Sequence, residues 1–253
     1  MHRLAVYSVK GGVGKTAAAV NLAFAGAQSG YRTLLIDLDP QGASSYYLRT
    51  EPSGDVEDRW YMGDRKQLLQ GIRASDFPRL HLLPSNLQHR TVEQVLGTKK
   101  KSDRQLRRRL AALEGRYDLV VMDAPPGIGL LAENVFAAVD AVLVPVIPTT
   151  LSARTLAQLV EHFQVAGLPS QHLHAFFSMA QVHKRMHREF MQRLRAQYGF
   201  FLDAEIPFSV DVENMGVRRA PLLASGSNRP AALAYRRLWD EVMQTLVPVR
   251  APV

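Results

Sequence analysis

The chain has 253 residues, of which 47% are apolar and 21% are charged, an ordinary composition for a globular protein. It has no cysteine, which excludes a disulfide scaffold, iron–sulfur ligation by cysteine and a thiol nucleophile. Lysine and arginine outnumber aspartate and glutamate by 31 to 23, and the resulting net charge of +8 favours polyanionic partners such as nucleic acid, anionic membranes or nucleotides.

Short apolar runs alternate with longer helical patterns along the chain. A strand is predicted at residues 3–9, followed by a glycine-rich turn, a helix over 15–29 and a buried strand at 33–37. Further strands are predicted at 80–83, 119–122, 141–146 and 173–177, and helices near 103–114, 130–138, 152–166, 184–198 and 230–246. Apolar strands separated by helices indicate an α/β fold with a doubly wound, mostly parallel sheet and helices on both faces.

The least regular stretch of the chain indicates the number of domains, and the apolar runs indicate the cellular location. Residues 50–65 are predicted to form an exposed loop, so we interpret 1–253 as a single domain. The apolar run before Lys10 is too short for a signal peptide, and no run approaches the length of a membrane span. We therefore expect a soluble cytoplasmic protein.

The most specific motif follows the first predicted strand and reads Lys10, Gly11, Gly12, Val13, Gly14, Lys15 and Thr16. Its glycines let successive backbone N–H groups point inward, and together with the N-terminus of the next helix these groups can form a cradle for phosphate. Lys15 would reach the β- and γ-phosphates, and the Thr16 hydroxyl would ligate Mg²⁺. The motif therefore predicts a nucleotide-binding site.

The loop departs from an ordinary phosphate loop. Val9 stands where the ordinary pattern has glycine, and the ordinary pattern does not require the lysine found at position 10. Because Lys15 occupies the phosphate site of its own loop, Lys10 cannot easily point into that site. Lys10 could instead reach the nucleotide of a second molecule.

Three aspartates are expected beside this loop. Asp37 and Asp39 lie on the same side of an extended segment at the end of one predicted strand, and Asp123 ends another. Ligand sites of open α/β sheets form at the carboxyl ends of the strands. Neighbouring carboxylates raise each other's pKa unless a cation lies between them, and Mg²⁺ with the lysines would supply that charge. Capping or turn roles are the alternative interpretation of these aspartates.

The motifs together resemble those of the ParA/MinD ATPases. KGGVGKT at 10–16, LLIDLDPQG at 34–42 and YDLVVMDAPPG at 117–127 are similar to the deviant Walker A, Walker A′ and Walker B motifs of that family, in the same order and with the same spacing. The segments at 80–86, 206–214 and 230–242 are similar to further parts of its short members. The resemblance covers essentially the whole chain and implies a P-loop NTPase-like fold.

This resemblance implies an Mg²⁺-dependent ATPase that forms a homodimer around two ATP molecules, with Lys10 crossing the interface. It implies catalytic roles for Lys10, Lys15 and Asp39, of which Asp39 would position the attacking water. Metal ligation, in part through water, is expected from Thr16, Asp37 and Asp123. Nucleotide contacts are expected from Gly11, Gly12, Val13, Gly14, Lys15, Thr16, Ala17 and Pro207. Ala17 stands where relatives usually carry threonine or serine, which predicts a weaker affinity for nucleotide.

Two basic clusters are candidates for binding DNA. The first spans 99–109, where a solvated helix face is the simpler interpretation. The second contains Lys184, Arg185, Arg188, Arg193 and Arg195, and Arg218 and Arg219 follow it. Because ParA proteins bind DNA non-specifically through their C-terminal halves, the resemblance favours contacts from Lys184, Arg185, Arg188, Arg218 and Arg219. A plain solvated surface is the alternative.

The resemblance also implies partners. A ParB-like protein or cargo adaptor would stimulate hydrolysis, and the cargo would be a plasmid, a chromosome origin or a protein complex, in the cytoplasm and near the nucleoid. No amphipathic helix follows the last predicted helix, so no membrane anchor is expected, which counts against a MinD-like regulator at a membrane or secretion site. An ATP-coupled metabolic enzyme is the other alternative.

Overall fold

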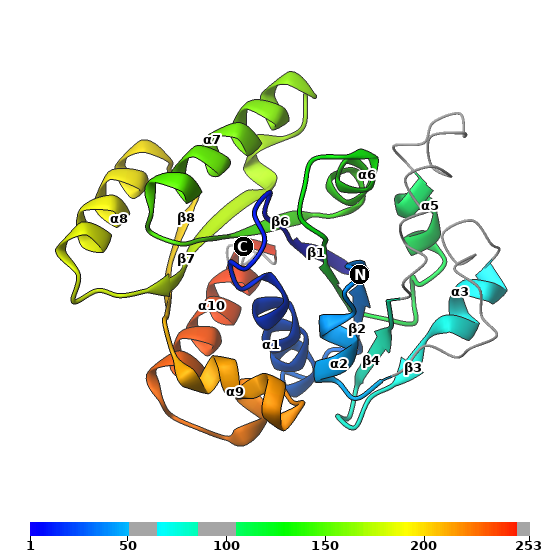
Figure 1. Ribbon diagram of the computed structural model, residues 1–253. Coiled ribbons are helices and arrows are strands. Elements are labelled where there is room, and N and C mark those ends of the chain that lie inside the picture. Colours follow the sequence, from blue (N-terminus) through cyan, green and yellow to red (C-terminus); the bar gives the residue numbers. More distant parts are fainter. Residues whose placement is uncertain (51–64, 86–104, 247–253) are drawn as a thin grey trace, which may run out of the picture.

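A single mixed sheet organises the computed structural model, which describes residues 1–50, 65–85 and 105–246 (Figure 1). The strand order is β3-β4-β2-β5-β1-β6-β7-β8, and every neighbouring pair is parallel except β3 with β4. The strands are β1 (His2–Val6), β2 (Thr33–Asp37), β3 (Arg73–Ala74), β4 (Leu80–Leu83), β5 (Leu119–Asp123), β6 (Ala141–Val146), β7 (Leu173–Ala180) and β8 (Phe201–Pro207). This confirms the predicted doubly wound, mostly parallel sheet.

Helices cover both faces of the sheet (Figure 1). One layer holds α1 (Lys15–Gln28), α9 (Val210–Arg218) and α10 (Pro230–Leu246), with the 3₁₀ turn η5 (Leu222–Ser225). The opposite layer holds α3 (Arg65–Gly71), α5 (Gln105–Ala111), α6 (Leu130–Ala138), α7 (Thr150–Val165) and α8 (Arg185–Gln197). The short helix α2 (Ala43–Tyr47) follows β2, and the 3₁₀ turn η4 (Ser170–His172) precedes β7.

The central strands separate two hydrophobic cores. In β2, Leu34 and Ile36 belong to the core under α5, α6 and α7, whereas Leu35 belongs to the core under α1 and α10. Successive side chains of a strand point to opposite faces, so a strand that is apolar at every position must be covered on both sides. All five residues of β2 and of β5 are buried accordingly. The two layers hold the carboxyl ends of these strands in fixed positions.

The element boundaries differ from prediction in a few places. The first strand ends at Val6 rather than at residue 9, because the chain turns there into the glycine-rich loop, although the Tyr7 N–H still donates to the Leu143 carbonyl at 2.9 Å. The strand predicted at 173–177 extends to Ala180, and α5 ends at Ala111. The predicted loop at 50–65 and residues 99–104 of the first basic cluster lie almost entirely outside the described residues.

The sequence did not predict β8. Its residues Asp203 and Glu205 alternate with buried Ala204 and Ile206, a pattern typical of a strand with only one apolar face. It forms the edge of the sheet and pairs only with β7. In the described part of the chain, no helix has the length and apolar content needed to cross a membrane.

Candidate nucleotide-binding site

The glycine-rich loop joins β1 to α1 at the carboxyl edge of the sheet. Gly12 and Gly14 have φ angles of +71° and +90°, a left-handed backbone that L side chains rarely adopt. Gly14 also lies so close to the end of β7 that an added Cβ would be 2.8 Å from Ser178 Oγ. The first N–H groups of α1 face this loop, where helix N-termini bind anions. The backbone here fits a phosphate group.

Lys15, the first residue of α1, is buried although it carries a long charged side chain. It is only 6% exposed, and its Nζ donates to the Lys10 carbonyl at 3.4 Å, the only hydrogen bond of this ammonium to the described residues. Burial lowers the pKa of Lys15, whereas the charges of Asp123 and Asp39 raise it. A buried cation with so weak a partner is suited to a bound phosphate.

Asp37 and Asp123 are neighbours across the carboxyl ends of β2 and β5, where the strand register pairs them directly. They are 1% and 0% exposed. Burial raises the pKa of Asp37, and the charge of Asp123 raises it further. Burial also raises the pKa of Asp123, against the opposing effects of the Ser44 and Thr16 hydroxyls and of Lys15. Two such carboxyls favour a cation between or beside them.

A metal ion would therefore find suitable oxygen atoms here. Asp123 Oδ1 is buried and has no hydrogen-bond partner among the described residues. Within those same residues, no group of three or more His, Cys, Asp or Glu side chains could hold a metal by itself. The remaining ligands would come from the Thr16 hydroxyl, water and nucleotide phosphates, which is the kind of site that Mg²⁺ prefers. The residues present fit Mg²⁺ bound together with a nucleotide.

Two serines that the sequence analysis missed hold these carboxylates in place. Ser44 Oγ donates to Asp123 Oδ2 at 2.8 Å. Ser45 donates to Asp37 Oδ2 twice, from its hydroxyl at 2.7 Å and from its backbone N–H at 2.9 Å. Both serines belong to α2, so this short helix fixes the orientation of two strands' terminal carboxylates. Two consecutive hydroxyl residues just after the 34–42 motif were the available signal.

Asp39 lies beyond the end of β2, at the partly exposed rim of this cluster. Its backbone N–H donates to Asp37 Oδ1 at 3.2 Å, and its own Oδ1 accepts from the Gln41 N–H at 3.0 Å. Its charge raises the pKa of both Lys15 and Asp123. The structure thus brings together Lys15, Thr16 and the three aspartates that the sequence placed at one site.

The remaining predicted nucleotide contacts lie at the same edge of the sheet. Pro207 ends β8 and pairs with Ala180 at the end of β7. Ala17 and Val13 are buried beside the loop. Tyr7 donates from its hydroxyl to the Gly127 carbonyl at 3.0 Å, which ties the turn after β5 to β1.

The predicted DNA-binding residues lie at the start of α8 and the end of α9 and are not among the side chains of this cluster. Lys184, Arg185 and Arg188 are exposed at the start of α8, where Arg185 pairs with Glu189 at 2.6 Å and Arg188 donates to the Val182 and His183 carbonyls. Arg218 is exposed at the end of α9. Arg219 lies over the Tyr46 ring at 4.6 Å and donates to the Tyr46 carbonyl, so its side chain contributes to the packing of α9 against α2.

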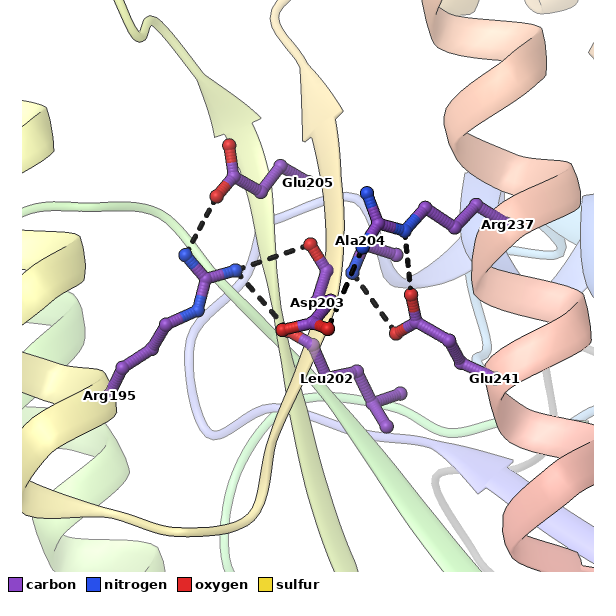
Figure 2. Close-up of polar contacts among 7 residues, drawn as sticks. All are labelled: Arg195, Leu202, Asp203, Ala204, Glu205, Arg237 and Glu241. Carbon is purple, nitrogen blue, oxygen red and sulfur yellow. Dashed lines mark hydrogen bonds and ion pairs between the residues drawn. The ribbon is translucent and has the colours of Figure 1, made fainter.

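Arg195, which the sequence groups with the basic cluster of α8, has a different role. Its guanidinium extends from α8 to β8 and donates to Glu205 Oε1 at 2.7 Å and to the Leu202 and Asp203 carbonyls (Figure 2). From the other side, Glu241 of α10 accepts the Ala204 N–H at 3.1 Å (Figure 2). These contacts occupy outward-facing backbone groups of the edge strand, and we exclude Arg195 from the DNA-binding surface.

Comparisons with known proteins agree with this geometry. A family model described as an AAA domain matches residues 1–172. The chain is 32% identical to the chromosome partitioning protein ParA of Caulobacter vibrioides over 250 residues, which cover 95% of this chain and 93% of that relative. It is 35% identical to the sporulation initiation inhibitor protein Soj of Bacillus subtilis over 159 residues, which cover 62% of each chain.

Solved structures show the same fold. Cobyrinic acid a,c-diamide synthase from Mycobacterium smegmatis, with a bound ATP analogue and magnesium, superposes with a TM-score of 0.82 at 25% identity, over 99% of this chain and 97% of that one. McdA from Cyanothece superposes with a TM-score of 0.81 at 19% identity, over 97% and 99% of the two chains. The family match, the near full-length similarity to ParA and the cluster of Lys15, Thr16, Asp37 and Asp123 show that this chain belongs to the ParA/MinD-type ATPases, which use ATP and Mg²⁺.

Proposed function

We propose that this ATPase forms a homodimer when it binds ATP, that the dimer binds DNA non-specifically, and that the cycle of ATP binding and hydrolysis positions a cargo. Residues 1–253 would act as one ATPase domain. The observation that carries the proposal concerns Lys10, a lysine of the phosphate loop whose side chain is not used to bind phosphate in its own protomer.

The backbone of Lys10 is engaged while its side chain is free. Its N–H donates to Ser8 Oγ at 3.3 Å, and its carbonyl accepts from Lys15 Nζ. Its own ammonium has no hydrogen-bond or ion-pair partner in the described part of the chain, and the residue is only partly buried. Because Lys15 already supplies the positive charge of this loop, Lys10 is available for the phosphates of a nucleotide in a second protomer. In that position it would stabilise charge in the transition state as an arginine finger does.

The roles of the other residues follow from their positions. The loop residues Gly11–Thr16 and the buried Ala17 would bind the phosphates through their N–H groups, with Lys15 as the principal charge. Thr16, Asp37 and Asp123 would hold Mg²⁺ directly or through water, and bound Mg²⁺ neutralises charge on the phosphates. Asp39, at the rim rather than within the cluster, would orient the attacking water. Pro207 would lie against the adenine.

The DNA-binding surface would be the exposed start of α8, with Lys184, Arg185 and Arg188, together with the end of α9 at Arg218 and Arg219. The exposure of Lys184, Arg185, Arg188 and Arg218 supports this proposal, whereas Arg219 is only partly exposed. A non-specific contact needs only charges that reach phosphates. A dimer presents this surface twice, which raises its avidity for a long DNA track. DNA binding would therefore depend on ATP.

A partner protein would stimulate hydrolysis and carry the cargo. Relatives bear the names chromosome partitioning protein ParA and cell division protein PomZ, which supports a cargo such as a plasmid, a chromosome origin or a protein complex. A ParB-like protein or another adaptor would be that partner, and the ATPase would be found on the nucleoid.

The substitution Lys10→Ala tests the proposal. ATP should still bind to the monomer, whereas dimerisation, hydrolysis and DNA binding should fall together, with hydrolysis lower by about 10³-fold if Lys10 acts as a finger in trans. Light scattering with ATP, the ATPase rate and DNA co-sedimentation should be measured on one preparation. Lys66→Ala, which removes an exposed lysine of α3, is the matched control. Normal dimerisation and hydrolysis by Lys10→Ala would contradict the proposed dimer.

A metabolic function is the second candidate. The similarity to cobyrinic acid a,c-diamide synthase reaches 26% identity with a TM-score of 0.80, and that protein was solved with ADP and magnesium. An ATP-coupled metabolic enzyme would have no reason to bind DNA more tightly with ATP than with ADP. DNA co-sedimentation of the wild-type protein with each nucleotide therefore separates the two functions.

A further inference from the structure

A pocket lies at the end of the sheet opposite to the nucleotide site. It has a volume of about 600 Å³, and its lining includes Arg32, Arg79 and Arg116. Arg32 directly precedes β2 and Arg79 directly precedes β4, whereas Arg116 lies three residues before β5. The three arginines are therefore near the amino ends of strands that are neighbours in the sheet. Parallel strands rise about 3.3 Å per residue, which places this end about 13 Å from the Asp37 end of β2.

The rim of the pocket is positively charged. The guanidinium of Arg32 is neutralised by Asp118, with Nη2 and Oδ1 2.7 Å apart. Arg79 has no carboxylate partner among the residues that the structure describes, and its Nη1 donates to the Gly30 carbonyl at 2.6 Å. The guanidinium of Arg116 has neither a hydrogen-bond nor an ion-pair partner among the described residues, and no carboxylate is among those that line the pocket. Two positive charges therefore remain available to an anion.

The floor of the pocket is apolar and aromatic. Leu69 and Ile72, partly buried on and after α3, form one part of it. Tyr117 and His81 form another, with their rings edge to face at a centroid distance of 5.6 Å and with Tyr117 OH 2.7 Å from His81 Nδ1. This contact fixes both rings. Because Tyr117 is only 8% exposed, the partly exposed ring of His81 is the preformed surface open to a flat group. Concave sites with an apolar floor and a few convergent polar groups are typical of small-molecule binding.

We propose that this pocket binds a small organic anion with an aromatic or other flat apolar body. The body would pack on Leu69, Ile72 and the His81 ring, while its phosphate or carboxylate would meet Arg79 and Arg116 at the rim. Guanidinium groups bind either anion through charge-assisted hydrogen bonds, so the two ligand classes share one chemistry. This site is independent of the nucleotide site and of the proposed function.

The test is a titration followed by NMR, on protein saturated with ADP and Mg²⁺ so that the phosphate loop is occupied. The probes are 1-naphthyl phosphate and 1-naphthoate. Inorganic phosphate tests the anionic group without the aromatic body, and uncharged 1-naphthol tests the aromatic body without the anionic group. Both naphthyl anions should shift the amide signals of Arg32, His81 and Tyr117, and the tighter of the two identifies the preferred anion. Inorganic phosphate and 1-naphthol should bind at least about fivefold more weakly.

Substitutions of Arg116 locate the binding. Arg116→Gln removes an exposed charge, so it should leave the fold intact and weaken binding of the naphthyl anions by about fivefold or more. Arg116→Lys should retain most of the affinity, and Arg154→Gln, at an exposed position of α7, should change nothing. Three outcomes would each overturn the proposal. The first is that the signal shifts are confined to residues 10–17, and the second is that Arg116→Gln and Arg154→Gln have equal effects. The third is that inorganic phosphate alone binds as tightly as the naphthyl anions.

Discussion

Asp37 and Asp123, which are 86 residues apart in the sequence, pair directly at the carboxyl ends of β2 and β5, and adjacent serines of α2 donate to them. Ser45 fixes Asp37 and Ser44 fixes Asp123, so the two carboxyls are positioned before any ligand binds. Such preorganisation lowers the cost of forming a metal site, because the ligands need not be ordered when the ion arrives. Burial disfavours the ionised form of both carboxyls, and the charge of Asp123 disfavours ionisation of Asp37 further.

The raised pKa of Asp37 predicts that the stability of the protein without nucleotide depends on pH. Burial raises the pKa of Asp37 above its unfolded value, so ionisation opposes folding as pH rises through the raised pKa. Asp37→Asn removes the ionisation and should raise the free energy of unfolding at pH 8 by about 1 kcal/mol or more. The gain should be largely lost near pH 4, where Asp37 is protonated in the folded protein and about half protonated in the unfolded chain.

Urea unfolding of the wild type and Asp37→Asn at both pH values measures this effect, with Asp240→Asn at an exposed position of α10 as the control. A gain that is equal at pH 4 and pH 8 would show that the ionisation of Asp37 is not its cause.

Asp39→Ala should separate ATP binding from ATP turnover. Asp39 lies at the rim of the carboxylate cluster, so its removal should leave nucleotide affinity within about threefold while hydrolysis falls by about 10²-fold or more. ATP binding and single-turnover hydrolysis are the measurements. Lys15→Ala is the contrasting variant, because it removes the buried charge of the cradle and should abolish binding itself. Retained hydrolysis by Asp39→Ala would exclude the proposed role in orienting water.

Charge reversal at the start of α8 should weaken DNA binding without changing basal hydrolysis. Lys184→Glu with Arg185→Glu removes two exposed positive charges, and each phosphate contact that is lost should flatten the log–log salt dependence by about 0.9 on duplex DNA. DNA binding with ATP at several salt concentrations gives the slope. The control variant, Lys66→Glu with Arg154→Glu, makes the same change in net charge on α3 and α7. Equal slopes for both double variants would exclude the start of α8 as the DNA-binding surface.

Arg195→Ala should expose the edge of the sheet. The variant loses an ion pair with Glu205 and frees the Leu202 and Asp203 carbonyls, so the free energy of unfolding should fall by about 1 kcal/mol. Uncovered strand edges also pair with other chains, so the variant should associate as its concentration rises. Urea unfolding and sedimentation velocity test both effects. Arg193→Ala, two residues away on the same helix, should leave stability and association unchanged if the contacts to β8 are the cause.

Contiguous residues encode those parts of this protein that could be predicted before the fold was known. The residues of 10–16 form the phosphate loop because glycines at fixed positions permit its backbone, and the apolar runs at 33–37 and 119–122 require a sheet covered on both faces. The order of the motifs placed the aspartates at one edge of that sheet. These features depend on local conformation and on burial, which a single sequence reveals.

Contacts between residues that are distant in the sequence could be identified only from the folded structure. The pairing of Asp37 with Asp123 follows from the adjacency of β2 and β5, the serine contacts from the position of α2, and the role of Arg195 from the edge position of β8. No local pattern separates an arginine that binds a strand edge from one that faces solvent, because both lie at polar positions of an amphipathic helix. Their difference arises only when the sheet is assembled and each side chain meets the residue that the strand order brings to it.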